Sequence, residues 1–195
     1  MKAFLIIIGF CFFVKVNAQY VVGSNIQAVG NGGVAVNGIF SLTRNQAGIV
    51  HVQKPIVAIN CQQFYSNSEL YAQSVLFALP LQSQSKLGFN LSNFGIPGTS
   101  SLFKAGISYA RKFQNFHSAL TVNYFSSYLK NYASSSSFTV DIGMQYQIFE
   151  DLRFGFLFSN VSRETFDNTS SDLLPSYLGA GVVYDISQVG AGRRS

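Results

Sequence analysis

The segment that decides the fold is FTVDIGMQYQIFEDLRFGFLFSNV, residues 138–161. Apolar side chains occupy every second position over residues 138–146, and the same alternation resumes over residues 152–158. A period of two residues places the two sets on opposite faces of a pleated strand. Two polar residues, Glu150 and Asp151, separate the two runs. The segment therefore predicts a β-hairpin with one apolar, aromatic face and one polar or small face.

Similar alternation recurs along the chain and predicts eight strands, at residues 55–65, 70–79, 87–95, 103–113, 116–128, 138–149, 152–161 and 176–187. Most have a length that lets a tilted strand cross about 25 Å of hydrocarbon. Four charged residues fall on the polar faces of these strands: Lys104, Asp141, Arg153 and Asp185. A charge on a lipid-facing position near the midplane would cost about 2–4 kcal/mol, so this distribution suits a barrel wall.

We therefore expect an all-β fold, an antiparallel transmembrane β-barrel with a lumenal polar face. Only 11% of the residues are charged, against about 25% in ordinary soluble domains. Residues 1–18 have a positive start, an apolar stretch and a small-x-small ending, which predict a secretory signal peptide. No other stretch of 18 apolar residues occurs, so we expect no transmembrane helix.

Residues 19–54 are rich in glycine and do not alternate. A phosphate-binding loop would need a lysine followed by serine or threonine after the glycines, and that pair is absent. We interpret the segment as a glycine-rich plug or lead-in to the strands of residues 55–187. The irregular tail, residues 188–195, contains no aromatic-ended final strand. Eight strands could close a small barrel, but this ending favours a truncated part of a larger one.

The connections are predicted to alternate in length. The connections at residues 114–115 and 150–151 are tight, and longer polar ones are expected at residues 96–102, 129–137 and 162–175. Outer-membrane barrels have short periplasmic turns and long external loops. The tight turns are therefore expected on the periplasmic side of an outer membrane.

No catalytic constellation is evident, and we expect no enzyme activity, no cofactor and no metal site. His117 and Asp141 share the predicted lumenal face, but pairing Tyr128 with Phe138 would separate them by about 26 Å along the strands. His51 belongs to the irregular lead-in, so we expect the two histidines to lie far apart. Cys61, alone after the signal peptide, is interpreted as a packing residue.

Lys104 and Asp141 are the most interesting lumenal charges. The tight turn at residues 114–115 and the same pairing of Tyr128 place them at one level, across one intervening strand. We interpret them as an ion pair that neutralises lumenal charge, and a ligand-orienting role is the alternative. The scattered basic residues indicate no nucleic-acid partner.

Three stretches together resemble one family. Asn45-Gln46-Ala47-Gly48-Ile49 resembles an Asn-Pro-Ala-Gly-Leu motif, and it accompanies Gly106-Ile-Ser-Tyr-Ala-Arg-Lys-Phe and the glycine-containing strands of residues 141–160. The chain thus resembles the PorV/PorQ-like outer-membrane proteins, relatives of the FadL transporters of hydrophobic compounds. Gln46 replaces the usual proline. The resemblance implies a plug formed by Asn45, Gln46, Ala47 and Gly48.

Three functions follow as hypotheses. The first is a non-enzymatic outer-membrane barrel, accessory to type IX protein secretion or without a defined role, with membrane lipid and secretion-machinery proteins as partners. The second is a FadL-like channel for small hydrophobic molecules, which would need an apolar path through the lumen. The third is a secreted soluble β-protein that binds a ligand or partner.

Overall fold

The computed structural model describes four segments of the chain: residues 32–64, 69–81, 84–164 and 174–186. The predicted signal peptide and the predicted irregular tail lie outside the described residues. Within those four segments, no helix is long and apolar enough to cross a membrane.

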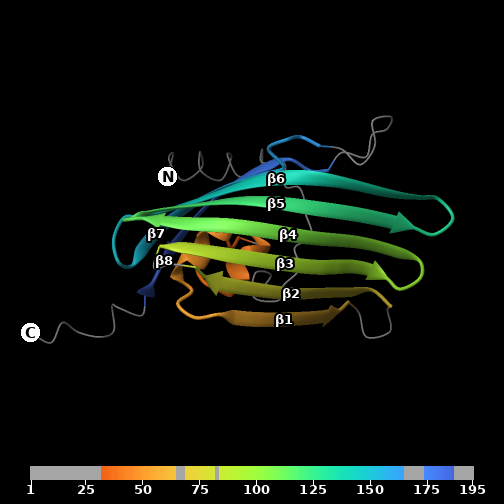
Figure 1. Ribbon diagram of the computed structural model, residues 1–195, viewed down its shortest axis with the longest axis horizontal. Coiled ribbons are helices and arrows are strands. Elements are labelled where there is room, and N and C mark those ends of the chain that lie inside the picture. The colour runs from red at the N-terminus through yellow and green to blue at the C-terminus, as the bar shows by residue number, and fades with distance from the viewer. Residues whose placement is uncertain (1–31, 65–68, 82–83, 165–173, 187–195) are drawn as a thin grey trace, which may run out of the picture.

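Eight antiparallel strands form one sheet, and each strand pairs with its neighbours in the sequence (Figure 1). They are β1 (Ile56–Gln63), β2 (Tyr71–Pro80), β3 (Ser85–Ile96), β4 (Ser100–Phe113), β5 (Phe116–Leu129), β6 (Ala133–Gln147), β7 (Leu152–Ser159) and β8 (Tyr177–Tyr184). This arrangement confirms the predicted all-β, antiparallel, eight-stranded fold. Strand number follows from local alternation, which is why the sequence pattern predicts it well.

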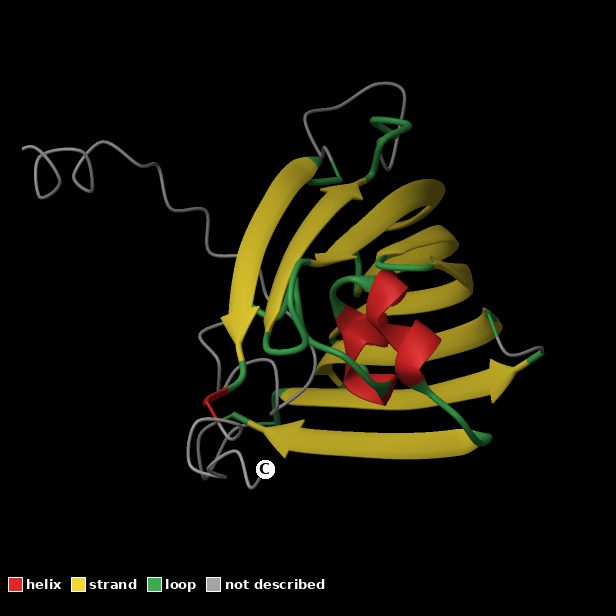
Figure 2. Cartoon of the chain, turned by 90° about the vertical axis from the view of Figure 1, so that its left-hand side faces the viewer, coloured by secondary structure: helices red, strands yellow, loops and turns green. Residues whose placement is uncertain are grey.

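The sheet is open. β1 and β8 stand at the two ends of the strand order, and among the described residues they do not pair with each other. Figure 2 shows the strands curving around two short helices, so the sheet has an inner, concave face and an outer, convex face. The described strands thus form a curved wall, without the closure of a complete barrel.

Two of the connections predicted to be long, at residues 96–102 and 129–137, are short in the structure. Residues 97–99 alone join β3 to β4, and residues 130–132 alone join β5 to β6. The serine-rich start of β6, over residues 134–137, pairs with β5 and is not a loop. Serine has a weak intrinsic strand preference, and here the neighbouring strand supplies the missing hydrogen-bond partners.

We call the end of the sheet with the connections at residues 114–115 and 148–151 the turn end. The opposite end, with the connections at residues 97–99 and 130–132, is the loop end. The observed register of β5 and β6 differs from the predicted one, because the β5–β6 connection at the loop end is tighter than predicted. Tyr128 lies opposite Ser134, and not opposite Phe138 as predicted.

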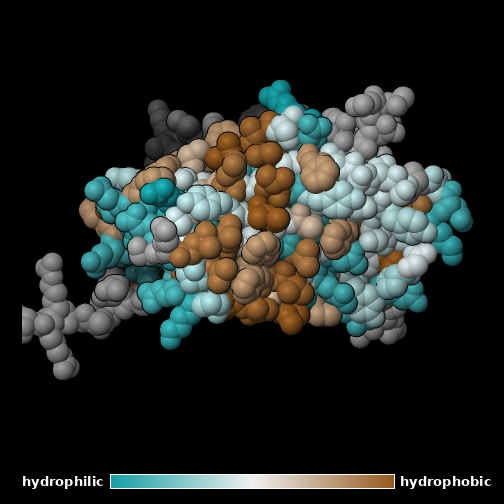
Figure 3. All heavy atoms as spheres, in the orientation of Figure 1, coloured by the Kyte–Doolittle hydropathy of each residue, from teal (hydrophilic) through white to brown (hydrophobic). Residues whose placement is uncertain are grey.

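The outer face carries an apolar belt across the strands, visible as a brown band in Figure 3. In the pairing register, Val57, Phe77, Phe89, Ile107, Val122 and Val140 form one continuous row of the belt. The neighbouring row consists of Ile59, Val75, Leu91, Ala105, Tyr124 and Phe138. Several side chains of the belt are strongly exposed: Ile59 is 75% exposed and Phe138 is 65% exposed. Nothing in the described chain covers this belt.

The inner face holds a compact plug, which we define as residues 32–52. Its two 3-10 helices are η1 (Ile39–Thr43) and η2 (Gln46–His51). Leu42 and Ile49 of the plug are almost fully buried against the small and apolar inner residues of β2 to β5, which include Leu76, Ala78, Ala110 and Ala119. The hydrophobic core of the molecule therefore lies between the plug and the inner face, near the turn end.

Candidate functional site

Asn45 joins the plug to the sheet. Its side chain is fully buried, and its amide Nδ2 lies within hydrogen-bond distance of the carbonyl oxygens of Val34 (2.6 Å), Met144 (3.0 Å) and Phe156 (3.2 Å). Its Oδ1 accepts from the backbone N–H of Ala47 and caps η2. One asparagine thus connects the plug backbone to both β6 and β7.

Glycines on the inner face make room for this attachment. A Cβ on Gly143 would collide with Asn45 Oδ1, and a Cβ on Gly155 would collide with the backbone of Val34 and Ala35. Gly48, within the plug, has no room for a side chain because Val36 and Ser41 pack against it. The small residues that alternate with aromatic ones in β6 and β7 therefore let the plug approach the backbone closely.

The four plug-motif residues suggested by the resemblance, Asn45, Gln46, Ala47 and Gly48, lie together at the start of η2 and are all buried. They contact the chain itself and leave no open surface for a ligand. These residues hold the plug against the sheet by hydrogen bonding and packing.

Asp141 is the centre of a buried polar cluster on the inner face of β6. Its Oδ2 accepts from Asn123 Nδ2 (2.8 Å), and its Oδ1 accepts from Ser159 Oγ (2.9 Å) and the Asn160 backbone N–H (2.8 Å). The carboxylate is 3% exposed, so these donors replace most of its hydration. Asn160 in turn organises the start of the β7–β8 connection, because its amide donates to the carbonyl oxygens of Glu164 and Leu174.

The prediction that Lys104 and Asp141 lie at one level is wrong. Lys104 is opposite Phe125, whereas Asp141 is opposite Thr121, four residues nearer the turn end. The error follows from the misjudged β5–β6 register. The Lys104 ammonium lies 5.2 Å from the centre of the Phe125 ring, and the charge of Asp141 still acts on it.

The other two charges predicted for the polar face lie elsewhere. Arg153 is opposite Gln147, about 20 Å along β6 from Asp141. Its guanidinium donates to Gln147 Oε1 (3.2 Å) and to the carbonyl oxygen of plug residue Ala35 (3.3 Å). Asp185 follows β8 at the turn end, and its charge acts on Arg153. Lys104, Asp141, Arg153 and Asp185 therefore do not form one site.

The structure overturns the expected separation of the histidines. η2 ends at His51, and the plug brings its ring edge-on to that of His117, with 4.9 Å between the ring centres. The two rings line an open pocket of about 540 Å³ at the turn end. Burial and the nearby Arg153 and Lys112 cations lower the pKa of His51 to about 4. Strand alternation carries no information about how the plug folds back, so the sequence pattern could not reveal this contact.

Metal-binding clusters are absent from the described segments: no three or more His, Cys, Asp or Glu side chains come together there in a way that could hold an ion. Cys61 is exposed on β1 and is not a packed core residue, contrary to our interpretation. A search against models of protein families finds no match for this chain, and a search of curated proteins also finds none.

Proposed function

We propose that this chain forms a wall of a non-enzymatic outer-membrane β-barrel, with a lumen that the plug fills at the turn end. The observation that carries the proposal is the outer apolar belt, which crosses β1 to β6 in continuous rows. Soluble monomers rarely expose contiguous apolar patches of more than a few hundred Å², and larger ones mark contact with a membrane or another protein.

The height of the belt favours a membrane over a protein partner. On the outer face of β6 every residue from Phe138 to Tyr146 is apolar, and the run spans nine residues with an aromatic residue at each end. Nine to eleven residues of a tilted strand cross the hydrocarbon of a bilayer, and aromatic girdles mark its two interfaces. A protein partner would cover one region of the convex face, whereas lipid covers it all round.

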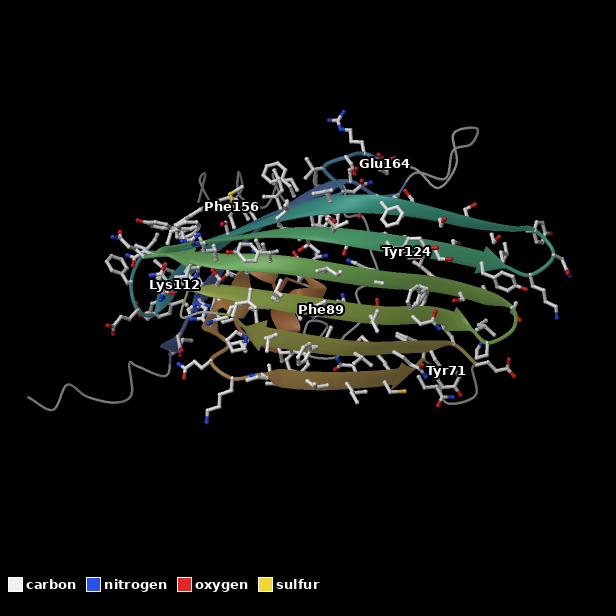
Figure 4. The ribbon with its side chains drawn as sticks, in the orientation of Figure 1. Tyr71, Phe89, Lys112, Tyr124, Phe156 and Glu164 are labelled. Carbon is white, nitrogen blue, oxygen red and sulfur yellow. The ribbon has the colours of Figure 1, made fainter. Side chains whose placement is uncertain are left out.

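The polar boundary of the belt supports the same conclusion. Directly beyond the row that contains Val75 and Leu91, the next outward row is mostly polar: Gln73, Asn93, Phe103, Ser126 and Ser136. On the outer face the side chains toward the loop end are thus mostly polar, as expected for strands that continue into water above the headgroups. Figure 4 shows Phe89 and Tyr124 within the belt, with Tyr71 nearer the loop end.

The secretion-accessory role of a PorV/PorQ-like protein fits this geometry better than transport of hydrophobic compounds. The inner face of β5 and β6 presents Asn123, Thr139, Asp141 and Gln145, all of which are buried and polar. A channel for apolar molecules needs an apolar path, and the apolar inner residues of β2 to β5 are covered by the plug. The predicted signal peptide is consistent with export to the envelope.

Tryptophan fluorescence tests the membrane placement. The chain contains no tryptophan, so a single introduced tryptophan gives a signal without background fluorescence from other tryptophans. Leu120→Trp places the probe on the outer face of β5, opposite Ile142 in the middle of the apolar run of β6, and Ser126→Trp places it on the same face beyond the belt. In liposomes with brominated acyl chains we expect strong quenching of Leu120→Trp and weak quenching of Ser126→Trp. Equal, weak quenching of both, together with a monodisperse preparation in water without detergent, would favour the secreted soluble protein.

A flux assay separates the two membrane functions. Liposomes that contain the chain should take up a hydrophobic fluorescent probe no faster than protein-free liposomes. Uptake that rises with the amount of protein would contradict the secretion-accessory role and support the FadL-like channel.

A further inference from the structure

The pocket at the turn end that His51 and His117 line, the histidine pocket, has no role in forming the proposed barrel wall. Its lining comes from three places: the end of the plug, the β4–β5 turn and the β6–β7 turn. The residues that matter for its chemistry are His51, Lys112, Gln114, Asn115, His117 and Glu150. Figure 4 places Lys112 at this end of the sheet, beside the plug. A volume of about 540 Å³ lies within the range of small-molecule sites.

His117 lies at the floor of the pocket with unused hydrogen-bonding capacity. Its side chain is 1% exposed, and neither ring nitrogen has a hydrogen-bond partner among the described residues. Gln145 lies opposite on β6, and its amide nitrogen donates to the carbonyl oxygens of Val34 and Val36. Its amide oxygen has no other partner within the described segments and acts on the His117 ring, but the geometry does not close a hydrogen bond between them. A buried polar ring without partners calls for an explanation, and a bound ligand or water is the usual one.

The electrostatic potential at the His51 and His117 rings is positive. The charged groups that act on both His51 and His117 are Lys112 and Arg153. Lys112 is the direct cross-strand neighbour of His117, and Arg153 holds the plug through Ala35. Glu150, on the β6–β7 turn, is the acidic group in the lining, and its charge is not among those that act on the rings. A divalent cation would therefore be repelled from the rings, whereas an anion would be attracted.

We propose that this pocket binds a small soluble anion that carries a carboxylate or phosphate group, held by Lys112 and by the N–H groups of His51 and His117. The proposal stands on the pocket alone and does not need the membrane placement. Binding is coupled to protonation. Burial and the nearby cations lower the pKa of His51, so its ring is neutral near pH 7 in the free protein. An anion beside the ring favours the charged form, so it binds together with a proton.

Histidine-selective ¹⁵N labelling tests the proposal directly, because the chain has only two histidines. The full chain, without a polyhistidine tag, is titrated at pH 6 with inorganic phosphate and separately with acetate. At least one of these anions should move both imidazole signals toward the protonated form and raise their titration midpoints by about one pH unit, a tenfold change in the protonation equilibrium. The stronger response identifies the preferred group.

Lys112→Gln removes the permanent charge next to His117 and leaves the rings in place. We expect this variant to weaken anion binding about tenfold, since hydrogen bonds to charged groups contribute about 1.5–3 kcal/mol. Lys130→Gln, in the β5–β6 connection at the loop end, is the matched control and should leave binding unchanged.

Three results would overturn the proposal. A response of both rings to Zn²⁺, with none to either anion, would make the pocket a metal site. A response to phosphatidylglycerol micelles but not to free phosphate or acetate would make its ligand a lipid headgroup. No response to any of these probes would leave the two rings as a contact that fastens the plug to β5.

Discussion

The two faces of β5 and β6 differ in the polarity of their side chains and in how specific the contacts of those side chains are. On the outer face the side chains of the belt are apolar and in part exposed, and they pack against one another, as Tyr124 does against Phe138. On the inner face several buried polar side chains have specific partners, as in the contacts of Asn123 with Asp141 and of Gln145 with the plug. An outer residue therefore needs only the right polarity, whereas an inner residue also needs the right shape and the right neighbour.

The sharpest test of this contrast is Asp141→Ala. The change leaves Asn123 Nδ2, Ser159 Oγ and the Asn160 N–H without their buried acceptor. It also leaves Lys104 without the negative charge that acts on it. We expect the free energy of unfolding to fall by about 3–5 kcal/mol, measured by urea denaturation in detergent. Asp141→Asn keeps the shape and one acceptor and should cost less, and equal losses in both variants would show that only the shape matters.

Leu120→Arg tests the outer face, where polarity should decide. In lipid, an arginine at the middle of the belt is expected to lower the free energy of unfolding by about 2–4 kcal/mol. Ser126→Arg, on the same face of β5 but beyond the belt, should change it by less than about 1 kcal/mol. If the two variants unfold alike in liposomes, the belt does not face lipid.

Gly155→Ala tests how closely the plug approaches the inner face. The added methyl group would collide with the backbone of Val34 and Ala35, neither of which can move aside as a flexible side chain can. We expect a loss of about 1–3 kcal/mol in the free energy of unfolding. Faster proteolysis within the plug should accompany it.

Gly179→Ala is the matched control for that experiment. Its new methyl group would lie 3.4 Å from the Val34 side chain, an ordinary contact. The change should therefore alter the free energy of unfolding by less than about 0.5 kcal/mol. A loss as large as that of Gly155→Ala would indicate that these glycines serve the strands and not the plug.

The strands and their faces are predictable because alternation is a local property. Each pair such as Met144 and Gln145 shows its two faces in the sequence, wherever the partner strand lies. Register is not local. The serines at positions 134–137 have the composition of a loop, and treating them as one moved Asp141 by four residues relative to β5. The prediction that Lys104 and Asp141 lie at one level depended on that register and failed with it.

The candidate site is less predictable than the strands for the same reason. The plug has no periodic pattern, and its position depends on contacts between residues about 100 positions apart, as between Asn45 and Met144. The contact between His51 and His117 is a consequence of that fold. One signal was present in the sequence: the inner-face positions 143 and 155 are both glycine, which indicates that another part of the chain lies close to the sheet.

The smallest expected effect comes from the pH response of the histidine pocket. His51 has a pKa of about 4 in the folded protein, against 6.5 ordinarily. Above pH 6.5 the ring is neutral in both states and contributes nothing to the pH dependence. Between pH 6.5 and pH 4 the unfolded chain takes up a proton that the folded chain does not, so stability falls as the pH falls, and it levels off below pH 4.

His51→Asn should remove this part of the acid slope. Because His51 is only partly buried and remains open to solvent on one side, solvent screens the effect, and we expect the difference between the two proteins at pH 4.5 to stay below about 1 kcal/mol. Unfolding curves recorded from pH 7.5 to pH 4 in buffers without phosphate or carboxylates measure it, and subtracting the variant cancels the titration of the Asp and Glu residues. Parallel slopes for both proteins would mean that neither burial nor the positive charges of Arg153 and Lys112 lower the pKa of His51 in solution. The contrast between the outer and inner faces would then not extend to the turn end.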